Sequence, residues 1–91
     1  MTSRSSAEYN VFKEKVLKRD EWTCQFPNCK SQAQLEVHHI RPFSKDKHLR
    51  TDEMNGITLC HKCHSKLKAK EQQYEMLFFQ IVLAKYNKKS E

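Results

Sequence analysis

The stretch LEVHHIRPFSKDKHLRTDEMNGITLCHKCH, residues 35–64, contains all five histidines of the chain and two of its four cysteines. It opens with the adjacent pair His38 and His39 and ends on His64, which directly follows a Cys-x2-Cys pair. Between them stands Asn55-Gly56, a dipeptide typical of tight hairpin turns. Residues that bind metals and transfer protons are therefore concentrated here, and we expect this stretch to decide both the fold and the chemistry.

The four cysteines form two close pairs, Cys24-x4-Cys29 and Cys60-x2-Cys63. Two tight turns of this kind complete a tetrahedron around one ion, and four thiolates suit Zn²⁺, which is redox-inert and borderline soft. Such a site is closed, so we predict a structural zinc on which folding depends. Two disulfides are the alternative. The N-terminus MTSRSS disfavours them, because it lacks the apolar core of a signal peptide and so predicts a reducing, cytoplasmic location.

The composition limits the size of the core and favours a negatively charged partner. Of 91 residues, 37% are hydrophobic, and small folds with modest cores often add a metal. Lys and Arg number 17 against 11 Asp and Glu, and the formal charge of +6 suits nucleic acid. No apolar run approaches the roughly 20 residues that span a bilayer, so we expect no membrane partner.

The length of the chain predicts a single domain over residues 1–91, and its segments predict the α+β class. A polar tail at 1–6 precedes a helix at 6–19, where apolar residues recur at helical spacing. The metal frame and the core are expected within 24–68.

Two short strands are predicted in this central segment. β-Branched and apolar residues favour strands at 35–40 and 57–59. The polar span 43–54 suits an exposed loop, and Asn55-Gly56 is the strongest signal for a hairpin turn in the chain.

The C-terminal part is predicted to be helical, because neither glycine nor proline follows Gly56. Residues 62–87 form either one long helix or two helices with a bend, and a helix is expected at 70–88. Its apolar residues make two stripes, Tyr74, Leu77, Phe78, Ile81 and Val82 in the first and Met76, Phe79, Leu83 and Tyr86 in the second. One stripe is enough to cover a small core, so the second is either additional core or a surface for a partner.

The order of these motifs resembles the HNH endonucleases, most closely the four-cysteine zinc kind found as phage, homing and restriction-type enzymes. The resemblance runs from LKRDEWTC (17–24) through LEVHHI (35–40) and NGITLC (55–60) to about Lys68. It rests on the order and spacing of these motifs together. It implies a zinc-stabilised, treble-clef-like ββα-metal fold.

The resemblance assigns roles that the chemistry of each residue type supports. His39 is implied to be the general base, and histidine titrates near neutral pH. His38 and His64 are implied to bind a catalytic divalent ion, which stabilises charge on the phosphate and the leaving oxygen. Asn55 is implied to brace the loop that orients His39. Many relatives have Asp where His38 stands, so Mn²⁺, Ni²⁺, Co²⁺ or Zn²⁺ competes more strongly with Mg²⁺ here.

The implied function is metal-dependent DNA cleavage to 5′-phosphate and 3′-hydroxyl ends, with low sequence specificity. A monomer is expected to nick, and a dimer to cut both strands. Arg41, Lys66 and Lys68 are candidate phosphate contacts. The second apolar stripe is a candidate surface for a homodimer or a phage terminase-type partner. The alternatives are a phage packaging accessory protein and a non-catalytic zinc module that binds nucleic acid, although the latter leaves the histidines and Asn55 unexplained.

Overall fold

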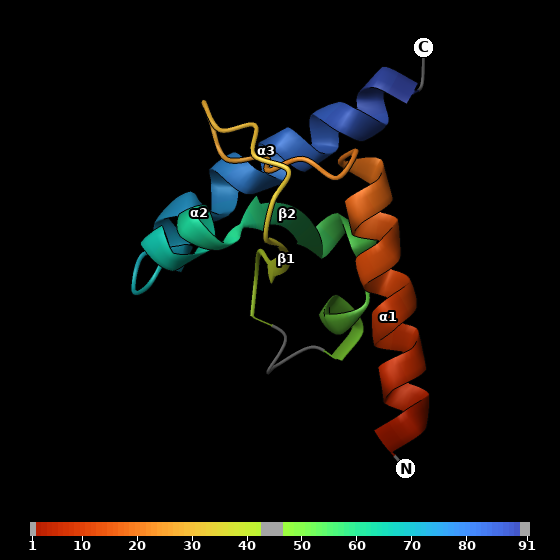
Figure 1. Cartoon of the computed structure of the whole chain (residues 1–91). Helices are drawn as coiled ribbons and strands as arrows, with labels where there is room; N and C mark the ends of the chain where they lie inside the picture. The colour runs from red at the N-terminus through yellow and green to blue at the C-terminus, as the bar shows by residue number, and fades with distance from the viewer. Residues whose placement is uncertain (1, 43–46, 90–91) are drawn as a thin grey trace.

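The computed structural model describes residues 2–42 and 47–89 of the chain. In chain order, the elements are helix α1 (Thr2–Arg19), strand β1 (Leu35–His39), 3-10 turns η1 (Lys47–Arg50) and η2 (Glu53–Asn55), strand β2 (Gly56–Cys60), and helices α2 (His61–Lys66) and α3 (Glu71–Lys89). α1 lies on one side of the two-stranded sheet, and α2 and α3 lie on the other (Figure 1). The α+β class predicted from the sequence is confirmed, with the long C-terminal helix among its elements.

β1 and β2 pair antiparallel, with His38 opposite Ile57 and His39 opposite Gly56. β2 is buried along its whole length, because helices cover both faces of the sheet. The connection between the strands is long and contains both 3-10 turns. Asn55 ends η2, and Gly56 has extended backbone (φ −116°, ψ 147°) as the first residue of β2. The tight hairpin turn predicted at Asn55-Gly56 is therefore wrong.

Gly56 is needed for the close approach of α1. A Cβ atom at this position would lie 2.8 Å from the ring of Phe12 and 2.8 Å from a methyl group of Val16. Both side chains are fully buried, so neither has free space into which it can retreat. The glycine signal in the sequence was real, but its cause is packing between α1 and β2 and not a turn conformation.

α1 begins at Thr2, so the polar tail expected at 1–6 is helical from Thr2 onward. Met1 lies outside the described residues. Residues 2–6 are polar and add nothing to the apolar periodicity, which is why the sequence placed the start of the helix too late.

The C-terminal segment consists of two helices, the second of the two alternatives predicted. α2 ends at Lys66, and α3 starts at Glu71. In the connection between them, Ala69 has a positive φ of 64°. This left-handed conformation stops a helix, and the sequence does not reveal it because the residue is not glycine.

The core joins the first stripe of α3 to β2 and the cysteines. Its buried members are Cys24, Ile40, Ile57, Leu59, Cys60, Cys63, Leu67, Phe78 and Val82. The second stripe is divided: Phe79 and Tyr86 pack against this core, whereas Met76 and Leu83 are 71% and 46% exposed. A homodimer or terminase-type partner at this helix stays a prediction. No helix in the described part of the chain is long and apolar enough to cross a membrane.

Candidate functional site

The four cysteines converge from three elements. Cys24 and Cys29 lie in the loop after α1, Cys60 ends β2, and Cys63 lies in α2. Their sulfur atoms all lie within 4.8 Å of one another. The backbone N–H of Cys24 donates to the carbonyl of Ser31 at 2.8 Å, which helps to close the first cysteine turn.

This donor set fits the structural zinc predicted from the sequence. Burial raises the pKa of the Cys24 and Cys63 thiols, while a hydrogen bond from the Cys63 backbone lowers the pKa of Cys60 to about 7. Buried thiolates repel one another without a cation, and a divalent ion at their centre stabilises the ionised form. Binding of the ion therefore releases protons and contributes free energy to folding.

His38 and His64 form a second group of potential metal ligands, apart from the four cysteines. Nδ1 of His38 lies 3.3 Å from Nε2 of His64. This separation is less than twice a usual metal–nitrogen distance of about 2.1 Å, so both nitrogens can contact one ion. Burial lowers the pKa of His38 to about 4, which keeps its imidazole neutral at pH 7, the form that binds metal.

Glu36 holds the other nitrogen of His64. Nδ1 of His64 donates to one carboxylate oxygen of Glu36 at 2.5 Å, and Nδ1 of His61 donates to the other at 2.8 Å. A carboxylate only accepts, so both imidazoles carry a hydrogen on Nδ1. These two hydrogen bonds lower the pKa of Glu36, and the bond from His64 has the larger effect.

Glu36 and His61 were not among the candidate residues from the sequence. Glu36 stands two residues before His38, so the alternation of a strand puts both on one face. His61 stands three residues before His64, so a helix puts both on one face. These spacings can be read from the sequence, but only the packing of α2 against β1 brings the two faces together.

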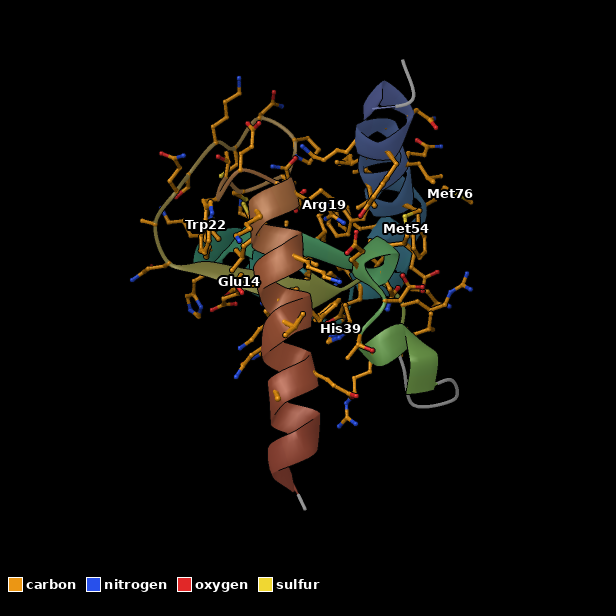
Figure 2. All side chains as sticks on the ribbon, turned by 90° about the vertical axis from the view of Figure 1, so that its right-hand side faces the viewer. Glu14, Arg19, Trp22, His39, Met54 and Met76 are labelled. Carbon is orange, nitrogen blue, oxygen red and sulfur yellow. The ribbon has the colours of Figure 1, made fainter. Side chains whose placement is uncertain are left out.

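His39 is the last residue of β1, on the face covered by α1. Its ring stacks on Phe12 with centroids 5.2 Å apart, and on Tyr9 at 5.9 Å. Figure 2 shows His39 beside α1, near the connection that contains η1. Nε2 of His39 lies 2.9 Å from the carbonyl oxygen of Arg50, which only accepts. The hydrogen is therefore on Nε2, and the basic lone pair is on Nδ1.

Asn55 is 1% exposed and ties together the two ends of the connection between the strands. Its side-chain oxygen accepts from the backbone N–H of Arg41 at 2.9 Å. Its amide nitrogen donates to the carbonyls of Arg41 and Leu49, at 3.0 and 3.1 Å. Leu49 directly precedes Arg50, the partner of His39.

A cleft of about 510 Å³ opens beside His39. Ile40 and Pro42 line it on one side, and Glu71, Gln72 and Glu75 of α3 line it on the other. The cleft therefore reaches from the end of β1 to the helix that covers the face of His38. Two carboxylates give this opening a negative wall.

The three candidate phosphate contacts lie in different places. Arg41 is not among the residues that line the cleft, but its guanidinium lies 3.9 Å from the carboxylate of Glu75, which lines it. Lys66 lines a different cleft, beside the cysteines, and Lys68 is exposed in the connection after α2. Of the three, Arg41 is therefore the one with a printed contact to a residue of the His39 cleft.

The comparison with protein families agrees with this arrangement. The model of the HNH endonuclease family matches residues 23–70, which include all four cysteines and the histidine pair. The chain belongs to the HNH endonuclease family, as the motifs predicted, and membership implies DNA as the substrate. No curated protein and no solved structure matches the chain.

Proposed function

We propose that this protein is a metal-dependent endonuclease that hydrolyses DNA phosphodiesters to 5′-phosphate and 3′-hydroxyl ends. The observation that carries the proposal is the separation of 3.3 Å between Nδ1 of His38 and Nε2 of His64. Two neutral imidazoles at this separation suit one divalent ion. The family match adds the class of enzyme and the kind of substrate.

In this mechanism His38 and His64 would hold the catalytic ion, which would supply positive charge to the phosphate and the leaving oxygen. His39 accepts the proton of the attacking water, the bond between phosphorus and the 3′ oxygen breaks, and the departing oxygen takes a proton from solvent. The hydrogen bond of His39 to the carbonyl of Arg50 supports the role of this residue, because it assigns the lone pair to Nδ1. Asn55 acts through the backbone of the same connection and is a positioning residue.

The surroundings favour a cation. Glu71 and Glu75 line the cleft of His39, and a phosphate enters such a negative opening more readily when a divalent ion offsets the charge. In the described part of the chain, the four cysteines are the one group of three or more potential ligands close enough to share an ion. An ion held by His38 and His64 alone would have positions left for water and phosphate oxygens.

The metal preference follows from the ligands. Two imidazoles form a softer site than aspartate plus histidine, so Mn²⁺, Co²⁺, Ni²⁺ and Zn²⁺ compete with Mg²⁺. A single centre cuts one strand per encounter, and we expect nicking with low sequence specificity. Arg41, which contacts Glu75 beside the cleft, is the phosphate contact that we favour.

The test is conversion of supercoiled plasmid in the presence of Mn²⁺ or Mg²⁺. We expect wild type to produce open circles and His39→Ala to be slower by roughly 10²–10⁴-fold, the usual contribution of a general base. Gln73→Ala, an exposed position on α3, is the control and should nick like wild type. Equal rates for wild type and His39→Ala, with equal zinc content, would contradict the proposal. DNA binding without cleavage would instead favour the non-catalytic zinc module.

A further inference from the structure

Glu36 connects two histidines, and the mechanism above gives it no role. We propose that Glu36 is a positioning residue for the catalytic ion: it holds His64 in the tautomer that binds metal through Nε2, and His61 holds Glu36 in turn. The inference rests on the proposed function, because it concerns the same His38–His64 pair.

The tautomer of His64 decides whether the pair can bind. A neutral imidazole carries its hydrogen on either nitrogen, and a hydrogen on Nε2 of His64 would occupy the position that faces Nδ1 of His38. The contact of 2.5 Å between Glu36 and Nδ1 of His64 keeps the hydrogen on the far side of the ring. Nε2 then presents its lone pair toward His38, 3.3 Å away. A partner of this kind also fixes the orientation of the ring.

The backbone keeps these residues in register. His61 begins α2, and its backbone N–H donates to the carbonyl of Gln34 at 2.9 Å, next to the start of β1. Glu36 and His38 share one face of β1, while His61 and His64 share one face of α2. The carboxylate therefore lies between two elements that are already joined, and it needs no rearrangement to reach His64.

His61 supports the carboxylate from the solvent side. The Glu36 side chain is 38% exposed, so water competes for its oxygens. The bond of 2.8 Å from Nδ1 of His61 occupies the second oxygen and limits rotation of the carboxylate. This bond joins His61 to Glu36 and not to His64. Removal of the His61 side chain should therefore weaken metal binding less than a change of Glu36 itself.

Glu36 is not placed to be a ligand of the same ion. Its oxygen contacts Nδ1 of His64, whereas Nε2 faces His38, so the imidazole ring stands between the carboxylate and the pair. Substitution of Glu36 should therefore weaken metal binding without changing the number of bound ions.

The experiment compares Glu36→Gln with Glu14→Gln in zinc-loaded, full-length protein. Glu14 is exposed on α1, and its substitution makes the same change in charge. Titration calorimetry with Mn²⁺ measures the affinity of the second site. We expect Glu36→Gln to bind Mn²⁺ about 10–100-fold more weakly, as for other partners of metal-binding histidines, and Glu14→Gln to bind like wild type. His61→Ala should give an intermediate affinity.

A second readout follows the tautomer itself. Long-range ¹H–¹⁵N correlation spectra should show His64 protonated on Nδ1 in the wild type, and a mixture of tautomers in Glu36→Gln. Wild-type Mn²⁺ affinity and an unchanged tautomer in Glu36→Gln would overturn the inference and leave the proposed function intact. A wild-type protein that binds no second ion would overturn both. If Glu36→Gln fails to retain zinc, the Mn²⁺ affinity and the His64 tautomer are compared between His61→Ala and wild type instead.

Discussion

Asn55 shows how one side chain can determine the path of the chain beside His39. It accepts one hydrogen bond and donates two, all of them to backbone groups that precede it in the chain. A primary amide is the side chain that offers an acceptor and two donors on one flat group. At 1% exposure, water cannot replace a missing partner. The identity of the residue therefore follows from its backbone contacts as well as from the family motif.

Asn55→Asp keeps the shape of the side chain and replaces the donor with an oxygen. The carbonyls of Arg41 and Leu49 would then face a carboxylate, so we expect a loss of roughly 2–3 kcal/mol in the free energy of unfolding and slower nicking. Urea denaturation of the zinc-loaded protein measures the loss. Asn87→Asp, an exposed position on α3, is the matched control. An unchanged unfolding midpoint for Asn55→Asp would show that these bonds contribute little.

At the scale of elements, two contacts near Asn55 help to join α1 to the rest of the domain. One is the packing of Phe12 and Val16 against Gly56. The other is Arg19, the last residue of α1, whose side chain extends toward η2 (Figure 2). It donates to the carbonyls of Glu53 and Gly56, each at 2.7 Å. The residues contacted, Glu53 and Gly56, lie on either side of Asn55 in the sequence. α1 therefore supports the loop of the site as well as the core.

Gly56→Ala should destabilise the protein by about 1–3 kcal/mol, because the new Cβ overlaps the ring of Phe12 and a methyl group of Val16. The φ of −116° suits alanine, so the cost comes from packing alone. In a Phe12→Leu background the same substitution should cost less. Denaturant unfolding of wild type, the two single variants and the double variant measures the coupling energy between Gly56→Ala and Phe12→Leu. An equal cost of Gly56→Ala in both backgrounds would refute the packing explanation.

Arg19→Lys tests the second contact. The guanidinium makes two bonds to the Asp20 carboxylate, at 2.8 and 2.9 Å, in addition to the two carbonyls. Lysine keeps the charge, but its ammonium cannot bond to all four acceptors that the planar guanidinium contacts. We therefore expect a loss of about 1–3 kcal/mol in the free energy of unfolding. The exposed Lys18→Arg variant, the reverse exchange at the neighbouring position, should have wild-type stability. A wild-type thermal midpoint for Arg19→Lys would count against this network.

At the scale of the whole molecule, the metal site and the core are the same structure. Cys24, Cys60 and Cys63 belong to the buried cluster that also contains Phe78 and Val82 of α3. The core is small, so loss of an ion bound by these cysteines would remove a large part of what holds the elements together.

We expect one zinc per chain in the four-cysteine site, and we expect its removal by a strong chelator to unfold the domain. Far-UV circular dichroism during chelation measures the loss of helix, and added Zn²⁺ should restore it. Manganese alone should not restore it, because four thiolates favour the softer ion. An apoprotein with the spectrum of the zinc form would show that packing alone suffices.

The sequence by itself determined the features that depend on local spacing and on residue chemistry. Helical periodicity and two short segments rich in β-branched and apolar residues predicted the α+β class, and two close cysteine pairs predicted the zinc site. The order of motifs identified the HNH family before any fold was known. These properties depend on residues that are near one another in the sequence, so one sequence is enough to recognise them.

Only the tertiary structure decided the features that join residues far apart in the chain. Glu36 and His64 are 28 positions apart, and Arg19 and Gly56 are 37 positions apart. No local pattern reports that Gly56 is needed for the approach of α1, or that Ala69 adopts a positive φ between two helices. Such contacts form when β1, β2 and the helices assemble, because the free energy that selects them comes from packing between elements and not from the propensity of any one segment.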